Sequence, residues 1–204
     1  KGREYYTTAD IRDIERENLE LVRELSPFNS VASLEEVRAF VKREVEKNGF
    51  RLSEGQLAQI ENELAGAAPV GVALGVAGSG KTLAPKIVER FNSEVLKPRG
   101  EEHYSVNIAF TGKAAQEMQR ACGRPAWTVD TFLNSYYRGD VRLQKEEGTT
   151  PRVVEAHEKI VITEGAQVVL RVDEMSFVGA RQARHLLQVV RELQQRGVQA
   201  KLQL

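Results

Sequence analysis

The sequence predicts an α/β fold in which a parallel sheet is flanked by helices. From residue 70 onward, short apolar runs typical of buried strands alternate with segments of helical periodicity, and such alternation is typical of βαβ units. The 204 residues are 41 % hydrophobic and 28 % charged, which suffices for one medium-sized domain with its own core. Disorder over the whole chain is therefore excluded.

Two amphipathic helices are predicted ahead of this alternation. The first starts at the S/T-x-x-D/E signal of Thr7 and Asp10, the second starts at Ser33, and apolar residues follow each at helical spacing. Gly49 suits a left-handed cap at the end of the second helix. We therefore assign residues 1–50 to an N-terminal helical segment and residues 51–204 to the α/β domain.

The α/β domain is predicted to begin with a helix from Ser53, which the sequence AGAAP ends ahead of the first strand. Buried strands are expected at 70–78, 105–110, 166–173 and 200–204, with helices at 80–91, from Gly112 and at 179–196. Because helices separate the strands, the strands should be parallel, with helices on both faces. A charged segment containing glycine and proline, 138–165, interrupts this rhythm, and we expect a surface insertion there, for which a hairpin is one form.

The composition excludes several classes of protein. Basic and acidic residues number 29 each, so no overall positive field indicates nucleic acid, and DNA binding would need a local groove. A single cysteine, Cys122, excludes an internal disulfide and agrees with a cytoplasmic location. No run approaches the roughly 18 to 20 apolar residues that span a bilayer, so membrane insertion is not expected. The scattered histidines lack the spacing of zinc ligands.

A glycine-rich motif carries the clearest chemistry. It reads Gly75, Val76, Ala77, Gly78, Ser79, Gly80, Lys81, Thr82, which matches G-x-x-x-x-G-K-[S/T] between a predicted strand and a predicted helix. The glycines let backbone N–H groups and the positive end of the helix face phosphate oxygens. Lys81 is then expected to reach the β and γ phosphates of ATP, and Thr82 to ligate Mg²⁺. The alternative is a glycine-rich turn before a helix.

Two carboxylates follow the predicted strand 166–173. Asp173 ends this strand, at the edge where a parallel sheet would also place the glycine-rich motif, and suits the second Mg²⁺ ligand. Glu174 would orient or deprotonate the attacking water. Lys81, Asp173 and Glu174 are thus the predicted catalytic residues, and an acidic turn is the alternative for the pair. Arg171 is unusual inside such a strand, where an edge-facing position or an inward ion pair would accommodate it.

Other side chains suggest contacts with a base or with phosphate. The amide of Gln56 would pair with an adenine edge, although an exposed helix glutamine is as good an explanation from the residues alone. Thr111, Gly112 and Lys113 lie between a strand and a helix, so a hydroxyl, backbone N–H groups and an ammonium converge on one anion site that suits a nucleic-acid phosphate. A solvated lysine at a helix N-terminus is the alternative there.

Aromatic side chains between residues 127 and 137 have two explanations. Trp127, Tyr136 and Tyr137 would stack on bases, as aromatic residues do in single-strand binding proteins. Packing in the core under the sheet explains Trp127, Phe132 and Leu133 more simply, and we favour it for these three.

Taken together, these segments resemble superfamily 1 DNA helicases of the RecD-like type, and among them the helicase part of TraI-type conjugative relaxase–helicases of the MobF class. The blocks occur in the order of that family: LSEGQL as the Q motif, GVAGSGKT as motif I, FTGKAAQEM as motif Ia and VDEMS as motif II. AWTVDTFL lies where the family has its next DNA-contacting segment. The N-terminal stretch EYYTTADIRDIERENLELV resembles the helix that precedes the helicase core in relaxase–helicases.

The resemblance implies a RecA-like fold and a 5′-to-3′ ATP-dependent DNA helicase that serves plasmid transfer. By position it implies that Gln56 reads adenine, that Lys81 and Thr82 hold phosphate and magnesium, and that Asp173 and Glu174 serve metal and water. Single-stranded DNA would contact a further group of residues, Thr111, Gly112, Lys113 and Thr128. Phe110 and Met175 depart from the proline and the small residue common in the family.

The resemblance also implies a longer polypeptide, because Leu204 falls within a predicted strand, ahead of the family's G-D-x-x-Q block. Residues 51–204 would then be a partial first RecA-like domain, and a second one, which carries the arginine finger, and a possible relaxase domain would be intramolecular partners. We expect single-stranded DNA and the conjugation machinery as further partners, and ATP binding with little turnover by this part alone. A non-catalytic DNA-binding module, a RecD-type exonuclease subunit and a P-loop kinase are the alternatives.

Overall fold

A parallel sheet organises the chain in the computed structural model, which describes residues 8–73, 83–101, 103–144, 153–156, 159–173 and 178–204. Within these residues the sheet has five strands, all parallel. In spatial order they are β1 Val70–Gly71, β8 Gln199–Gln203, β7 Gln167–Asp173, β2 His103–Ala109 and β3 Ala126–Thr128. The predicted α/β fold with a parallel sheet is confirmed.

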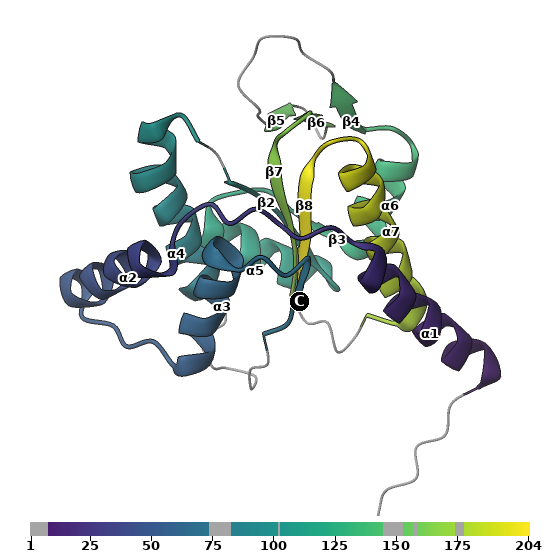
Figure 1. Ribbon diagram of the computed structural model, residues 1–204, viewed down its shortest axis with the longest axis horizontal. Coiled ribbons are helices and arrows are strands. Elements are labelled where there is room, and N and C mark those ends of the chain that lie inside the picture. Colours follow the sequence, from purple (N-terminus) through teal and green to yellow (C-terminus); the bar gives the residue numbers. More distant parts are fainter. Residues whose placement is uncertain (1–7, 74–82, 102, 145–152, 157–158, 174–177) are drawn as a thin grey trace, which may run out of the picture.

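Helices cover both faces of this sheet (Figure 1). One face carries α3 Glu54–Ala65, α4 Leu83–Phe91 and α5 Gly112–Cys122, and the other carries α1 Ala9–Glu24, α6 Val129–Tyr137 and α7 Ala180–Gln195. The chain moves from β1 to β2 to β3 in one direction and from β7 to β8 in the opposite direction. Because crossovers between parallel strands are right-handed, the two directions place α4 and α5 on one face and α7 on the other.

Local signals set the helix ends largely as predicted. The hydroxyl of Ser33 accepts a hydrogen bond from Glu36 N at 3.2 Å at the start of α2 Leu34–Asn48, and Gly49 ends this helix with φ 69°. Ser53 begins α3, as predicted. The predicted start of the first helix at Thr7 is wrong by one residue: Thr8 caps α1, since its hydroxyl accepts from the backbone N–H three residues later.

Several elements differ from the prediction. The strand expected at 70–78 is described only at its start, as β1, and the strand expected at 105–110 begins two residues earlier and ends before Phe110. The short strand β3 was not predicted as a strand, because three residues are too few to show an alternating pattern. Also unpredicted are the π-helix η1 Asn92–Leu96 and the 3-10 helix η2 Lys97–Arg99, where Pro98 cannot donate the backbone hydrogen bond that would continue α4.

The segment 138–165 forms a second, smaller sheet. Its described strands are β4 Val141–Gln144, β6 Lys159–Thr163 and β5 Val153–Ala156, in that spatial order. β5 and β6 pair antiparallel, as in a hairpin, while β4 pairs with β6 in parallel. Ile160 and Ile162 of β6 are buried in the core of the main sheet. This small sheet lies at the top of the view in Figure 1, whereas the C-terminus lies near the centre.

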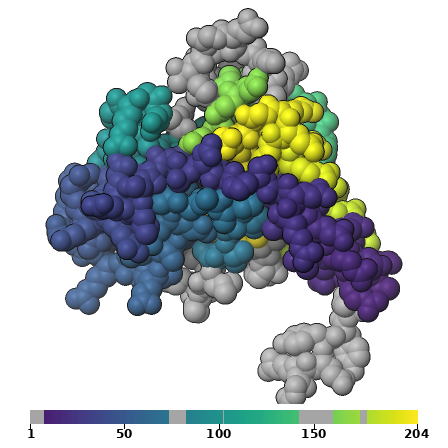
Figure 2. Space-filling model, viewed as in Figure 1, coloured from purple at the N-terminus to yellow at the C-terminus, as the bar shows by residue number. Residues whose placement is uncertain are grey.

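The N-terminal segment crosses the molecule from α1 to α2. Figure 2 shows it as a continuous band over one face. Leu21 of α1 and Leu25, which follows this helix, are buried in the core that the sheet forms with α7. Val37 and Phe40 of α2 pack with α3 and α4 instead. Between them, Val31 N donates to Leu64 O at 2.9 Å. Residues 8–50 therefore contribute to both hydrophobic clusters of the domain.

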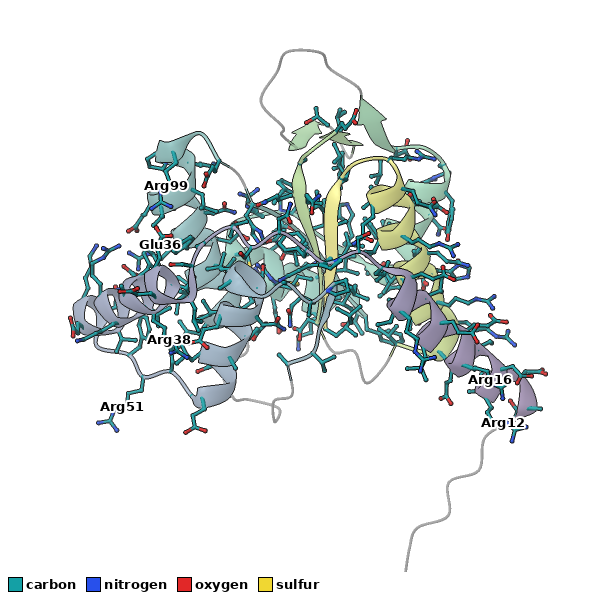
Figure 3. The ribbon with its side chains drawn as sticks, in the orientation of Figure 1. Arg12, Arg16, Glu36, Arg38, Arg51 and Arg99 are labelled. Carbon is teal, nitrogen blue, oxygen red and sulfur yellow. The ribbon has the colours of Figure 1, made fainter. Side chains whose placement is uncertain are left out.

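Exposed ion pairs accompany this packing. Arg38 of α2 pairs with Glu61 of α3 at 2.6 Å, and Arg99 of η2 pairs with Glu36 of α2 (Figure 3). Such pairs are screened by water and contribute little. The position of α2 is therefore set mainly by its buried apolar side chains. None of the helices in the described part of the chain is long and apolar enough to cross a membrane.

Candidate functional site

The ends of three neighbouring strands lie level at one edge of the sheet, which we call the carboxyl edge. The register pairs Asp173 of β7 with Ala109 of β2, and Ala109 with Thr128 of β3. Since neighbouring strands are about 4.8 Å apart, Asp173 and Thr128 lie about 10 Å apart along this edge. β2 and β7 are also the strands between which the direction of the crossovers reverses. Open α/β sheets bind ligands at such a point.

β1 ends at the same edge. Gly71 is in register with Gln203, and Gln203 is in register with Arg171, so β1 ends almost level with Asp173 and two strands away from it. Ala73 N extends this pairing by donating to Leu204 O at 2.7 Å. The chain thus enters residues 74–82 at the carboxyl edge, on the side of the sheet where α4 then begins.

Helix N-termini gather at the carboxyl edge, because α4, α5, α6 and α7 each follow a strand that ends there. Thr111 caps α5 by accepting from Ala114 N at 3.2 Å, and Thr128 caps α6 by accepting from Thr131 N at 3.1 Å. Gly112 and Lys113 follow Thr111 in the first turn of α5, and both are exposed. The partial positive charge of helix N-termini suits a polyanionic ligand.

Asp173 offers a carboxylate, a possible metal ligand, at the end of β7 on this edge, and its side chain is half-buried. The described residues contain no group of three or more His, Cys, Asp or Glu residues that could hold a metal ion. A carboxylate oxygen is a ligand that Mg²⁺ accepts when it binds together with a nucleotide, alongside hydroxyl groups, water and phosphate. The chemistry of Asp173 is therefore compatible with Mg²⁺.

Gln56 is buried rather than exposed, with 8 % of its surface accessible. Its side-chain oxygen accepts from Ser53 N at 2.8 Å, while the Ser53 hydroxyl accepts from Gln56 N, and together these bonds form a capping box. The exposed-glutamine alternative is wrong. The hydrogen bond to Ser53 orients the amide at the start of α3, and its contact with adenine stays a prediction.

Part of the predicted site lies outside the described residues. This holds for the glycine-rich motif Gly75 to Thr82, including Lys81, and for Glu174. Their roles toward phosphate, metal and water stay predictions.

The aromatic residues near the site pack mainly in the core. Phe132 and Leu133 are buried, and Trp127 and Tyr136 pack against the same cluster. Tyr136 also donates its hydroxyl to Glu192 at 2.8 Å. The core interpretation is confirmed for Phe132 and Leu133, whereas Tyr137 is 55 % exposed.

Arg171 forms the inward ion pair that was one of its two possible environments. It is 2 % exposed, on the face of the sheet covered by α3, α4 and α5. Its Nε donates to Glu63 Oε2 at 3.2 Å and its Nη2 to Glu63 Oε1 at 2.5 Å. Nη2 also donates to Ser105 Oγ at 2.9 Å, and Nη1 donates to Asn107 Oδ1 at 2.8 Å. The guanidinium thus joins α3 to β7 and β2.

Further charges surround this pair. Nη1 of Arg171 lies 3.6 Å from Glu89 Oε1 on α4, and His103 Nε2 lies 3.3 Å from Glu63 Oε1. Burial alone would raise the pKa of Glu63, but the charge of Arg171 and hydrogen bonds from His103 and Arg171 lower it below the ordinary value. Burial alone would lower the pKa of Arg171, whereas Glu63 and Glu89 raise it. Both residues therefore stay ionised inside the domain.

Lys201 of β8 is a second buried cation on this face. Its Nζ donates to Asn62 O at 2.5 Å and to Gly66 O at 3.2 Å, both at the C-terminal end of α3, and lies 4.7 Å from the centre of the Phe28 ring. Carbonyl groups at a helix end and an aromatic face both stabilise a cation. Burial nevertheless lowers the pKa of Lys201 to about 8, against the attraction of Glu63.

This lysine should make stability depend on pH. The native chain releases the Lys201 proton near pH 8, whereas the unfolded chain holds it up to the ordinary pKa of 10.5. Between these values the unfolded state binds more protons, so the free energy of unfolding rises with pH. We expect the free energy of unfolding of the wild type, relative to that of Lys201→Met, to rise by up to about 3 kcal/mol from pH 7.5 to 10.5. Urea unfolding measures this free energy. Lys42→Met, at an exposed position of α2, is the control. A difference that is flat with pH contradicts the expectation.

The polar face of the sheet was missed in the sequence, although a signal for it exists. His103, Ser105 and Asn107 alternate with apolar residues along β2, and Lys201 and Gln203 do so along β8. Successive strand residues point to opposite faces, so this alternation marks one face as polar. Glu63 had no comparable signal, because a glutamate within a helix is ordinarily exposed.

Comparison with known proteins agrees with this architecture. The model of the family described as an AAA domain matches residues 51–199. The match spans α3, the glycine-rich motif, four of the five strands of the main sheet and α7, and it ends at the first residue of β8. A search of curated proteins found no match to the chain.

Proposed function

The chain belongs to the AAA domain family of P-loop NTPases, and from this membership we propose that it binds ATP with Mg²⁺ at the carboxyl edge and works in an ATP-dependent DNA helicase. We assign the helicase to the 5′-to-3′ type of conjugative relaxase–helicases. Its partners would be single-stranded DNA, a second RecA-like domain, a possible relaxase domain and the conjugation machinery.

One observation carries this proposal: the register that sets Asp173 level with Ala109 and Thr128. The carboxylate that we propose as a metal ligand and the turn that we propose as a DNA-phosphate site, Thr111 to Lys113, thereby lie at a single sheet edge. β2 runs directly into that turn and pairs with β7 along its whole length. A change in the state of a nucleotide bound near Asp173 would shift β7, and the paired strand β2 would transmit this shift to the turn of Thr111 to Lys113.

Each residue has a distinct task in the proposed reaction. Lys81 would bind the β and γ phosphates, Thr82 and Asp173 would hold Mg²⁺, and Glu174 would orient the attacking water. The amide of Gln56 would select adenine. Bound Mg²⁺ would neutralise charge on the phosphates. Thr111 and Lys113 would hold one DNA phosphate between a hydroxyl, a helix N-terminus and an ammonium.

Replacing Lys113 with alanine is expected to weaken the binding of single-stranded DNA about fivefold to tenfold at low salt. One lost phosphate contact should reduce the salt slope of log K by about 0.7. Fluorescence anisotropy with a labelled oligo(dT) over a salt series measures both quantities. Lys42→Ala on α2 is the matched control, because it removes an exposed charge away from the carboxyl edge.

The effect of ATP on the affinity for DNA provides a second test. If the two sites are coupled, ATP changes the DNA affinity and DNA changes the ATP affinity by the same factor. ATP binding without any DNA binding would argue against the helicase and for a phosphotransferase that acts on a small molecule. Equal loss of DNA affinity in Lys113→Ala and Lys42→Ala would argue against the proposed contact.

A further inference from the structure

We propose that Arg171, through its bidentate pair with Glu63, is a positioning residue that holds the adenine-reading helix and the metal-binding strand in one alignment. The inference rests on the proposed function, because it takes Gln56 as the adenine contact and Asp173 as the metal ligand. Arg171 itself would touch neither ligand.

The pair links the two segments that bear these ligands. Arg171 precedes Asp173 by two residues on β7, so both side chains lie on the same face of the sheet, about 7 Å apart along the strand. Gln56 and Glu63 are seven residues apart on α3, so two helical turns place them on one face, and both are buried. The Arg171–Glu63 contact therefore fixes the distance between α3 and β7 close to both ligand-binding residues.

The direction of α3 brings Gln56 toward the carboxyl edge. The C-terminal end of α3 meets Lys201, which lies two residues before Gln203 on β8, and Glu63 meets Arg171. α3 consequently runs antiparallel to the strands, with its N-terminal turn nearest to the strand ends. Gln56 and Asp173 thus lie on the same side of the Arg171–Glu63 pair.

A guanidinium suits this role because its planar set of donors restricts angles as well as distances. Arg171 also donates to Ser105 and Asn107 on β2, the strand that leads to Thr111, and lies beside Glu89 on α4, the helix that follows residues 74–82. The elements that bear the proposed adenine, phosphate, metal and DNA contacts therefore meet at one side chain.

Folding alone does not require charges here. On the opposite face of the sheet, the neighbouring positions Val106 of β2, Leu170 of β7 and Leu202 of β8 are buried and apolar. A buried ion pair is often replaceable by apolar residues of similar size with no loss of stability. What apolar residues lack is the directional bonding that selects one arrangement.

The test uses two ratios that partial loss of folded protein does not change. One is the affinity for ATP relative to GTP, which reports Gln56, and the other is the affinity for ATP with and without Mg²⁺, which reports Asp173. Both are obtained by titration with fluorescent nucleotide analogues. In Arg171→Met/Glu63→Leu each ratio is expected to fall at least threefold, while thermal unfolding still shows one cooperative transition near that of the wild type.

The matched control is Arg90→Met/Glu44→Leu. This Arg–Glu pair joins α4 to α2, away from the sheet, and Glu44 is buried. The control should keep both ratios. Unchanged ratios in Arg171→Met/Glu63→Leu would overturn the inference, as would an equal fall in the control. If the double variant does not fold, Arg171→Lys decides, because it keeps the charge but loses the bidentate geometry: lowered ratios support the inference and wild-type ratios overturn it.

Failure of the proposed function would look different. A wild-type chain that binds no nucleotide, or whose ATP preference survives Gln56→Ala, would remove the assumed ligand contacts themselves. Wild-type ratios that depend on Gln56 and Asp173, but not on Arg171, would leave the proposed function intact and remove only the positioning role.

Discussion

Replacing Lys81 with alanine is expected to lower the affinity for ATP with Mg²⁺ about 100-fold and, in a polypeptide that includes the proposed second RecA-like domain, to reduce ATP hydrolysis to background, while DNA binding without nucleotide is retained. The ammonium would be the only side-chain cation of the glycine-rich motif, and it would face the most highly charged part of the ligand. Losing one preorganised contact to developing negative charge lowers rates by about 10² to 10³. Nucleotide titration and phosphate release measure the two effects.

Lys86→Ala is the control for this variant. Lys86 is exposed on α4, the helix that follows the motif, so the same charge is removed without a phosphate contact. We expect its ATP affinity to match the wild type. Unaltered ATP affinity in Lys81→Ala would mean that the match to the P-loop pattern does not reflect phosphate binding in this chain, and the proposed nucleotide site would have to be abandoned.

The single substitution Arg171→Met should lower the free energy of unfolding by about 3 to 5 kcal/mol, the largest stability effect we expect at any one residue. It leaves Glu63 as a buried carboxylate without its main counter-charge, and a charge stranded in this way is strongly destabilising. In the wild type the pKa of Glu63 is lowered, mainly because Arg171 outweighs the effect of burial. Without Arg171, burial would raise it.

The sign of the pH dependence follows from these directions. In Arg171→Met the native state would take up a proton on Glu63 as the pH falls, so lowering the pH from 7 to 5 should reduce the stability difference from the wild type. Urea unfolding at several pH values measures this difference. Arg99→Met, which breaks the exposed pair with Glu36, should leave stability almost unchanged. If Arg171→Met is no more destabilised than Arg99→Met, the buried network contributes nothing to stability.

Adding Glu63→Leu to Arg171→Met should recover most of the lost stability, since the stranded charge is then removed as well. Recovery of stability without recovery of the two nucleotide ratios would separate the contribution of the pair to folding from its contribution to the site. The double-mutant cycle is informative because the two residues are in direct contact.

The sequence by itself determined the features that depend on neighbours within one helical turn or one strand. Ser33 and Ser53 start their helices and Gly49 ends one, because a cap is made by residues at most a few positions apart. The alternation of strands and helices likewise indicated the parallel sheet. The glycine-rich motif was identifiable because its residues are consecutive.

Only the tertiary structure decided the strand order and the register, and with them which residues share the carboxyl edge. Asp173, Thr111 and Thr128 are far apart in the chain, and no local pattern states that their strands end level. The environment of Arg171 shows the same limit: its partners Glu63 and Asn107 are 108 and 64 residues away. Such contacts form only when distant strands and helices pack. Packing buries the charge of Arg171, and a buried charge needs a partner because an unpaired one is strongly unfavourable. The sequence therefore marked Arg171 as unusual, and the packing of α3 against β7 determined its partner.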